Sequence, residues 1–291
     1  MKVRACAKIN LYLDVTAKRA DGYHDIVSIM QTVDLHDEVS VQISEGERAE
    51  IVLHCGADLP CDGRNLAYKA AERYFTGLVP CRIEIDIDKH IPMQAGLAGG
   101  SADAAAVLRA LNAHFGKYDE QALRALGASL GADVPFCMVG GTRITRGIGE
   151  IMQASAPMPD CVLVIARGGE GISTPWAYGA LDEKFGDFKA QGSESEARLA
   201  RVVNAMEQGN LAAMSNAMYN IFESVVLPVH EAAATAKNIM LAGGAIGALM
   251  SGSGPSVVGV FTDEKAAQCV RDEIAQMGTA AFVCRPVNRI E

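Results

Sequence analysis

Apolar and polar residues alternate along residues 6–15 of this 291-residue chain. Successive side chains of a β-strand point to opposite faces, so this period of two predicts a strand. Ile9 and Leu11 would lie on the core face. Lys8 and Asn10 would project together from the opposite face, off the core.

Similar patterns predict further elements in the first half of the chain. Strands are expected at residues 39–43, 49–53 and 82–87. Residues 44–48 would form the loop of a hairpin between the first two of these strands. Residues with high helix propensity predict helices at 65–75, 101–115 and 119–130. Residues 136–139 and 142–145 resemble a short hairpin around Gly140 and Gly141.

Two prolines, Pro157 and Pro159, mark residues 154–160 as a domain boundary, which divides the chain into residues 1–155 and 156–291. In the second part, strands are expected at residues 161–166, 245–250, 256–261 and 280–284. Helices are expected at residues 176–181, 194–208, 229–241 and 264–277. The polar stretch 182–196 would be a solvated loop. This mixture of helices and strands predicts an α+β layer architecture for each half.

The charge balance excludes one broad class of partner. The formal net charge is −9, and no long cluster of Lys or Arg interrupts it. A protein that neutralises many phosphates of a nucleic acid needs a basic face. We therefore expect no nucleic-acid partner, although a small anionic substrate needs only a few local donors.

The sequence also lacks the usual signals of a metal cage or a membrane protein. The eight cysteines include no CxxC pair, and the six histidines include no HxxxH or HExxH pair. We interpret the cysteines as reduced thiols in a reducing cytosol. No apolar run approaches the roughly 20 residues of a membrane span, and the N-terminus does not read as a signal peptide. We expect a soluble, cytoplasmic protein.

The most informative stretch is residues 91–106, in which Gly96, Gly99 and Gly100 directly precede a predicted helix. Glycine lets the backbone turn sharply and approach a ligand. The first N–H groups of a helix lack partners, and the helix dipole adds roughly half a positive charge there. This combination suits a triphosphate. Ser101 would either cap the helix or place its hydroxyl on a phosphate or metal. A turn that only caps a helix fits the same residues.

Other nucleotide-binding motifs are missing from the sequence. There is no GxxxxGK[ST] motif and no HRD or DFG triplet. Three Gly-x-Gly triplets, at Gly147, Gly169 and Gly252, all lack the third glycine of a dinucleotide fingerprint. The protein-kinase and dinucleotide-binding templates are therefore excluded.

Three motifs, in this order along the chain, resemble those of the GHMP kinases: Ala7-Lys8-Ile9-Asn10-Leu11-Tyr12-Leu13, the glycine loop, and Ser251-Gly252-Ser253-Gly254-Pro255. Further matching stretches extend the resemblance over nearly the whole chain: Arg19-Ala20-Asp21-Gly22-Tyr23-His24, Gly131-Ala132-Asp133-Val134-Pro135-Phe136, Gly147-Ile148-Gly149-Glu150, and Ser173-Thr174-Pro175 with Tyr178. The segments at 21–24 and 131–135 are much more specific than a glycine loop. They are similar to the members of the family that act on a cytidine-bearing alcohol.

The resemblance implies both a fold and an activity. The fold would have two α+β halves, a ribosomal-protein-S5-domain-2-like N-terminal half and a ferredoxin-like C-terminal half, with a cleft between them. The activity would be ATP-dependent phosphorylation of the 2-hydroxyl of a cytidine diphosphate-linked methylerythritol, in non-mevalonate isoprenoid synthesis. Mg²⁺ would sit mainly on phosphates and water rather than in a cage of protein ligands. No obligate protein partner is expected.

The resemblance also implies roles for individual residues. Lys8 and Asp133 would be the catalytic pair: Asp133 orients the substrate hydroxyl and accepts its proton late, and Lys8 steadies the developing alkoxide. ATP phosphates would be bound by Pro92, Met93, Gln94, Ala95, Gly96, Leu97, Ala98, Gly99, Gly100, Ser101 and Ala102. The substrate would be bound by Asn10, Tyr23, His24, Ser251, Gly252, Ser253 and Gly254. Within this set, Tyr23 and His24 would form a cytosine site by stacking and hydrogen bonding. Asn65 would border the nucleotide.

One departure from the family pattern concerns the glycine loop. Relatives often read Gly-Leu-Gly-Gly-Gly-Ser-Ser, whereas Ala98 and Ala102 here replace a glycine and a serine. One hydroxyl near the phosphates is therefore missing. Ser101 or a backbone N–H group would have to make the contact instead.

Several alternatives fit parts of the same sequence. Without the resemblance, Lys8 would be an exposed strand lysine and Asp133 a turn or cap residue. A GHMP kinase for mevalonate, homoserine or a sugar is disfavoured by residues 21–24, because those substrates carry no base. A non-catalytic phosphate-binding module is disfavoured because Lys8 and Asp133 are both present.

Overall fold

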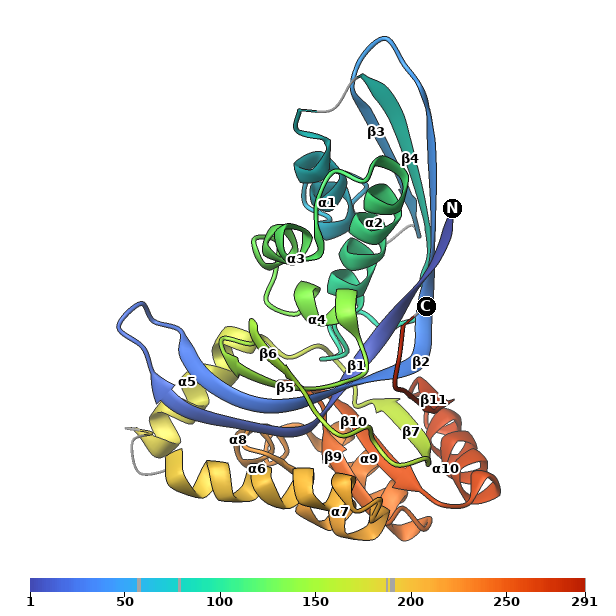
Figure 1. The fold of residues 1–291 in the computed structure, drawn as a ribbon. Coiled ribbons are helices and arrows are strands. Elements are labelled where there is room, and N and C mark those ends of the chain that lie inside the picture. Colours follow the sequence, from blue (N-terminus) through green and yellow to red (C-terminus); the bar gives the residue numbers. More distant parts are fainter. Residues whose placement is uncertain (57–58, 78–79, 187, 189–191, 291) are drawn as a thin grey trace. The chain divides into compact units, whose positions relative to one another are not determined.

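The computed structural model describes residues 1–56, 59–77, 80–186, 188 and 192–290 (Figure 1). The chain folds into two compact units. Unit 1 consists of Met1–Ala7, Leu35–Met93 and Ala98–Val139, and unit 2 of Lys8–Asp34, Gln94–Leu97 and Gly140–Glu291. Strands β1 (Lys2–Lys18) and β2 (His24–Glu45) contribute residues to both units. The predicted division after residue 155 stays a prediction.

The strands of unit 1 are arranged around β4 (Cys81–Asp88). The C-terminal part of β2 pairs with β4 in the antiparallel sense, and β3 (Glu50–Cys55) pairs with it in parallel. Every second residue of β4 is buried, beginning with Cys81, as expected for a strand with one face on a core. The strand predicted at 82–87 is therefore confirmed.

The described residues of unit 1 also form the helices α1 (Leu66–Phe75), α2 (Gly99–Phe115), α3 (Glu120–Ala128) and α4 (Val134–Val139). Side-chain caps start two of them, because the side chain of Asn65 accepts a hydrogen bond from the Ala67 N–H and that of Asp119 from the Ala122 N–H. Helices α1 and α2 pack against each other through small alanine side chains. The helices predicted at 65–75, 101–115 and 119–130 are confirmed to within two residues at each end.

The predicted hairpin between residues 39–43 and 49–53 is wrong. Both segments are strands, but β4 lies between them and pairs with each. Isoleucines on the buried face of β4 give this later strand enough apolar surface for a central position. Periodicity in the sequence predicts the strands and does not determine which edges pair.

The predicted hairpin at residues 136–139 and 142–145 is also wrong, although residues 142–145 do form a strand. Residues 134–139 form helix α4, whose first turn closes with a hydrogen bond from the Cys137 N–H to the Asp133 carbonyl. Val134, Phe136 and Cys137 are all buried. A short apolar run that is buried on every side shows no periodicity, so helix and strand look alike in the sequence.

Unit 2 contains a four-stranded antiparallel sheet with the order β11-β7-β10-β9. Its strands are β7 (Val162–Arg167), β9 (Gly247–Met250), β10 (Ser256–Phe261) and β11 (Ala281–Cys284). Helices separate β7 from β9, and α10 (Glu264–Gln276) separates β10 from β11. This β-α-β-β-α-β succession is that of a ferredoxin-like fold, as predicted.

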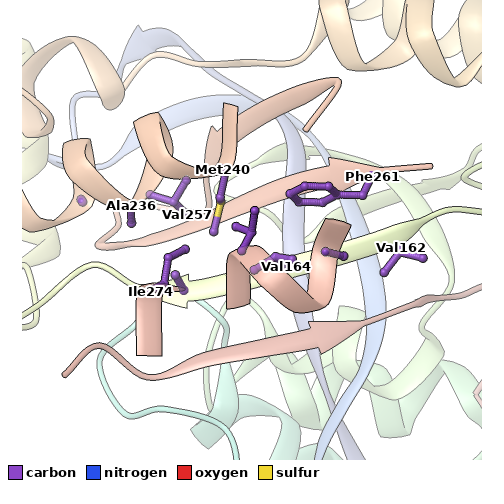
Figure 2. Close-up of a cluster of buried hydrophobic side chains, with 11 residues drawn as sticks. Val162, Val164, Ala236, Met240, Val257, Phe261 and Ile274 are labelled. Atoms are coloured by element: carbon purple, nitrogen blue, oxygen red, sulfur yellow. The ribbon is translucent and has the colours of Figure 1, made fainter. Parts of the chain in front are cut away.

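One face of this sheet is covered by α9 (Glu231–Ala242) and α10, as Figure 2 shows. Alternate residues of β7, Val162 and Val164, point into this cluster together with Phe261 of β10. Met240 of α9 and Ile274 of α10 fill the space between the helices and the strands. The cluster anchors β9 and β10, whose connecting turn carries residues 251–254.

The remaining elements of unit 2 attach to the long strands or form helices. The N-terminal part of β2 pairs with β5 (Thr142–Gly147) and β12 (Pro286–Val287), and β5 also pairs with β6 (Ile151–Ala154). β1 pairs in parallel with β8 (Tyr219–Asn220). The helices are α5 (Thr174–Phe185), α6 (Gly192–Glu207), α7 (Leu211–Ala217) and α8 (Glu223–Val226).

Residues 182–196 are not the solvated loop that was predicted. Helix α5 continues to Phe185, α6 begins at Gly192, and the side chains of Phe188 and Ser195 are fully buried. Phe188 joins an apolar cluster with Ala177 and Leu181 of α5. The rest of this prediction, at residues 187 and 189–191, lies outside the described residues.

No helix within the described ranges has both the length and the hydropathy that a membrane span requires.

Candidate active site

Lys8 and Asn10 lie on the same face of β1, as predicted, and this face is buried. Lys8 Nζ donates a hydrogen bond of 2.8 Å to Asn10 Oδ1, and the two residues are 4% and 3% exposed. Asn10 Nδ2 donates to Ser28 Oγ at 2.8 Å. The interpretation of Lys8 as an exposed strand lysine is therefore wrong. A buried ammonium requires polar partners, and here Asn10 fixes its position.

The turn at residues 251–254 is bound to the same asparagine. The Gly252 N–H donates to Asn10 Oδ1 at 3.0 Å, so this one oxygen accepts from both the turn and Lys8. Asn220 holds the turn from its other side, because its Nδ2 donates to the carbonyls of Met250 and Gly252 at 2.6 and 2.8 Å. Sequence analysis missed Asn220, which has no neighbouring motif to indicate it.

The first part of the glycine loop, residues 94–97, packs on this arrangement. The Leu97 carbonyl accepts from the Lys8 N–H, and the Ala95 carbonyl accepts from the Ser256 N–H. Ser251 Oγ donates to the Gly96 carbonyl at 3.2 Å. The structure thus brings together three of the predicted groups within unit 2: the Lys8–Asn10 strand, the loop and the 251–254 turn.

Backbone geometry explains why glycine is needed at position 96. Its φ is +74°, and a Cβ there would collide with the Ser251 carbonyl oxygen. Two residues of the same loop adopt this left-handed region without being glycine, Gln94 at φ 52° and Ala98 at φ 58°. Such a conformation costs an L-residue roughly 1–2 kcal/mol.

The second part of the loop, in unit 1, forms the start of α2. Ala98 is its N-cap, no side chain caps the helix, and the first turn contains no acidic residue. Gly100 is exposed and Ser101 partly so. Ser101 is therefore not the cap, and the first N–H groups of α2 are suited to an anion. Ala102 is buried, so its methyl group faces the core of unit 1.

For the other predicted phosphate-loop residues and for Asp133, the structure gives the exposure and the neighbouring element. Pro92 is partly exposed and Met93 is exposed. Asp133 is partly exposed and directly precedes α4 in unit 1, and a Cβ at the nearby Gly131 would lie 3.9 Å from Ser101 Oγ. Because Asp133 and Lys8 belong to different units, their pairing stays a prediction.

A buried ion network that sequence analysis missed supports the loop in unit 1. Asp37 is fully buried and accepts hydrogen bonds from the N–H groups of His90 and Ile91. Lys89 Nζ bridges Asp37 and Asp103, with 2.7 Å to Asp103 Oδ2. Burial raises the pKa of Asp103 to about 7, against the attraction of Lys89. The network ties the segment that leads into the glycine loop to α2.

A second polar group surrounds His24, at the start of β2. The His24 ring is 7% exposed and stacks on Tyr178 of α5 at 4.7 Å between centroids, with the edge of Phe188 nearby. His24 Nε2 lies 2.8 Å from Asp182 Oδ1, and Lys18 Nζ binds the same carboxylate at 2.6 Å.

The charge of Asp182 follows from these contacts. Burial disfavours its ionised form, yet the hydrogen bonds from Lys18 and His24 hold the pKa of the carboxyl below its ordinary value. Sequence analysis missed Asp182, because the predicted helix stopped at residue 181. The i, i+4 spacing of Tyr178 and Asp182 was the available signal, since such residues share one helix face.

The remaining predicted substrate residues are near the surface. Tyr23 is 62% exposed and follows the turn at Gly22, where φ is +86°. Ser253 is partly exposed, and its hydroxyl lies 3.0 Å from that of Thr174. Neither residue is held by the Lys8–Asn10 arrangement.

Comparison with known proteins agrees with this geometry. The GHMP kinases N terminal domain matches residues 65–141, and the GHMP kinases C terminal domain matches residues 202–280. The 4-diphosphocytidyl-2-C-methyl-D-erythritol kinase of Clostridium kluyveri is 40% identical over 291 residues, 99% of this chain and 100% of that protein. The chain belongs to this kinase family.

Two further relatives support the assignment to the 4-diphosphocytidyl-2-C-methyl-D-erythritol kinase family. The protein of that name from Caldicellulosiruptor bescii is 41% identical over 266 residues, 90% of this chain and 89% of that protein. A crystal structure of 4-(cytidine 5'-diphospho)-2C-methyl-D-erythritol kinase is 30% identical, with a TM-score of 0.80, and the match covers 98% of this chain and 99% of that one. The predicted fold and family are confirmed.

The strained Ala98 gives a first prediction. Ala98→Gly is expected to raise the free energy of unfolding by about 0.5–1 kcal/mol, because glycine adopts φ 58° without steric cost. Urea denaturation of the purified protein measures this change. Ala113→Gly, at an exposed position in the last turn of α2, is the control and should lose about 0.5–1 kcal/mol. Equal destabilisation by both variants would show that Ala98 is not strained.

Gly96 gives a second prediction with the opposite sign. Gly96→Ala should destabilise the protein by about 2–3 kcal/mol or more, because it adds a collision with the Ser251 carbonyl to the cost of the left-handed backbone. Gly116→Ala is the matched control: its φ is +62° and no atom lies within 4 Å of the added Cβ. Urea midpoints that fall equally for both variants would mean that the loop does not pack on the turn in solution.

Proposed function

We propose that this chain transfers the γ-phosphoryl group of ATP to the 2-hydroxyl of 4-diphosphocytidyl-2-C-methyl-D-erythritol. The products are the 2-phosphate and ADP, and the reaction would belong to non-mevalonate synthesis of isoprenoid precursors. The observation that supports this most is the buried Lys8–Asn10–Gly252 arrangement, packed on the glycine loop in a chain of this kinase family. It offers a fixed positive charge next to backbone that can bind phosphate.

The N-terminus of α2 would bind the ATP phosphates. The residues fit this ligand, because the helix starts without a side-chain cap or an acidic residue and Gly100 leaves its backbone exposed. Mg²⁺, when bound with ATP, would neutralise phosphate charge from positions on phosphate and water oxygens, and the Ser101 hydroxyl is the group of this loop that could contact it. Because Ala102 faces the core, Ser101 would serve alone.

Lys8 and Asp133 would act on the acceptor. Asp133 would orient the 2-hydroxyl and take its proton as the new O–P bond forms and the bond to ADP breaks. Aspartate is a weak base, so this proton would leave late in the transfer. Lys8 would stabilise the negative charge that develops on the oxygen, and Asn10 would hold the ammonium in place through the 2.8 Å hydrogen bond.

His24 would recognise the cytosine base. Its Nε2 faces the Asp182 carboxylate, which favours the tautomer with the proton on Nε2 and leaves Nδ1 as an acceptor. The exocyclic amino group of cytosine is a donor and would suit that nitrogen. Tyr178 already stacks on His24, so the exposed ring of Tyr23 would be the aromatic surface left for the base.

The proposal predicts a specific pattern of turnover. With Mg-ATP, purified protein should release ADP only when the cytidine-bearing alcohol is added, and not with mevalonate or homoserine. Asp133→Asn should lower kcat by about 100-fold or more while leaving KM for ATP nearly unchanged. Asp119→Asn, which keeps the N-cap of α3, is the matched control and should retain full activity.

Other results of that assay would each reject a part of the proposal. Turnover of mevalonate or homoserine would retain a kinase and reject the cytosine site. Near-native turnover by Asp133→Asn would reject the base assignment. ATP binding without turnover of any alcohol would indicate a phosphate-binding module.

The contact between Asp182 and His24 predicts a change in substrate affinity alone. Asp182→Asn should raise KM for the cytidine compound by about 3- to 10-fold, since it weakens one hydrogen bond that orients His24. His24→Ala should raise it further, and neither variant should change KM for ATP. Lys18→Gln is the control. It removes the other charged group bound to Asp182 but leaves the contact between Asp182 and His24 in place, so KM for the cytidine compound should change less. Equal effects on both substrates would contradict a role in base recognition.

A further inference from the structure

Two thiols of unit 1 lie side by side between β3 and α1. Cys55 is the last residue of β3 and Cys61 follows six positions later, before the cap of α1. Their Sγ atoms are 3.2 Å apart, whereas a disulfide bond is about 2.05 Å long. Cys61 is exposed and Cys55 is partly buried. The two sulfurs are therefore separate thiols, close enough to react with little movement.

Residues 59–64, which include Cys61, lead directly to the N-cap of α1. Asn65 caps the helix through Oδ1, and its Nδ2 donates to the Pro60 carbonyl at 3.1 Å and lies 3.9 Å from Cys55 Sγ. Cys55 Sγ also lies 3.8 Å from the Pro60 carbonyl oxygen. A shift of either cysteine would thus be transmitted to the hydrogen bond that fixes Asn65.

Contacts continue from this cap to the glycine loop. Leu66, the first residue of α1, packs next to Gly100, where a Cβ would lie 3.8 Å from Leu66 Cδ1. The Cys55 thiol is also close enough to Asp103 and Lys89 for their charges to act on its ionisation. The thiol pair is therefore linked to the start of α2 through Asn65 and Leu66.

The two thiols differ in reactivity. Burial and the hydrogen bond with Cys61 raise the pKa of Cys55 to about 11, so its thiolate is rare at neutral pH. The exposed Cys61 is the thiol that a reagent from solution reaches first. Once Cys61 forms a mixed disulfide with the reagent, it no longer carries the negative charge that disfavours the Cys55 thiolate. Cys55 can then act as the resolving thiol.

We propose that Cys55 and Cys61 form a reversible oxidation site that takes a small disulfide such as glutathione disulfide, and that their bond weakens ATP binding by the glycine loop. The Cys61 thiolate attacks one sulfur of the reagent and releases one glutathione. The Cys55 thiolate then attacks Cys61 Sγ and releases the second. The two protein thiols lose two protons and two electrons, and the reagent is reduced to two glutathione molecules.

The effect on ATP follows from geometry. Forming the bond brings the sulfurs closer by about 1 Å, which pulls on Cys61 and on the Pro60 carbonyl next to it. The Asn65 cap then shifts with that carbonyl, and Leu66 shifts against Gly100. We expect KM for ATP to rise at least threefold on oxidation and to return on reduction. This part rests on the proposed function; the thiol chemistry does not.

The test uses the full chain in buffers with increasing ratios of oxidised to reduced glutathione. Mass spectrometry of the peptide containing both cysteines should show the loss of two hydrogens in the wild type. Cys55→Ser should stop at a glutathione adduct on Cys61, and Cys61→Ser should form no disulfide. Cys269→Ser, which removes an exposed cysteine of α10, is the control and should oxidise like the wild type.

Each contrary result has a distinct meaning. A wild type that retains both thiols, or stops at the glutathione adduct, overturns the oxidation site. A disulfide that forms while KM for ATP stays constant overturns the coupling to the glycine loop. If reduced and oxidised protein both lack kinase activity, the proposed function fails, while the mass spectra still decide the thiol chemistry.

Discussion

A single amide oxygen organises the candidate active site of unit 2. Asn10 Oδ1 accepts from the Lys8 ammonium and from the Gly252 N–H, so it links β1 to the turn between β9 and β10. Burying an ammonium costs several kcal/mol unless its donors find partners. An amide compensates part of that cost without cancelling the charge. The positive charge therefore remains available to an anion, and its position is fixed by a strand and a turn that are both anchored in buried clusters.

The glycine loop depends on the same arrangement. Gly96 must be glycine because its backbone approaches the Ser251 carbonyl, and Ala98 adopts a left-handed conformation that favours glycine. A strained alanine at the N-cap is tolerated when the residues around it are held on both sides. Here hydrogen bonds hold residues 95–97 before Ala98, and the hydrogen bond from Lys89 to Asp103 holds α2 after it. The loop keeps its shape although alanine occupies a position that favours glycine.

Sequence patterns predicted the local elements well and the long-range pairings poorly. Helices α1–α3 and strand β4 follow from propensity, caps and a period of two, which are properties of neighbouring residues. The position of β4 between β2 and β3 depends on which buried faces match, which periodicity does not encode. The hairpin prediction failed for that reason.

The site shows the same division between local and distant information. Lys8 and Asn10 share a strand face, so their proximity follows from the period of the strand. Asp182 contacts His24 across 158 positions, and Asp37 contacts Lys89 across 52. The residues near Asp182 indicate at most that it shares a helix face with Tyr178, and nothing close in sequence indicates which distant residue either carboxylate contacts. Buried polar groups need partners, but the sequence does not say which residues will be buried until the fold has placed them.

The environment of His24 shows how such a distant contact would create specificity. Asp182 fixes one ring nitrogen, and Tyr178 covers one face of the ring, so the histidine cannot reorient to suit different ligands. A site that holds a polar group rigidly rejects a ligand without a matching group, because the group is then desolvated and left unpaired. A substrate without a base would leave His24 in that state. Discrimination against simpler alcohols would therefore come from the cost of the unpaired histidine as much as from contacts with the correct base.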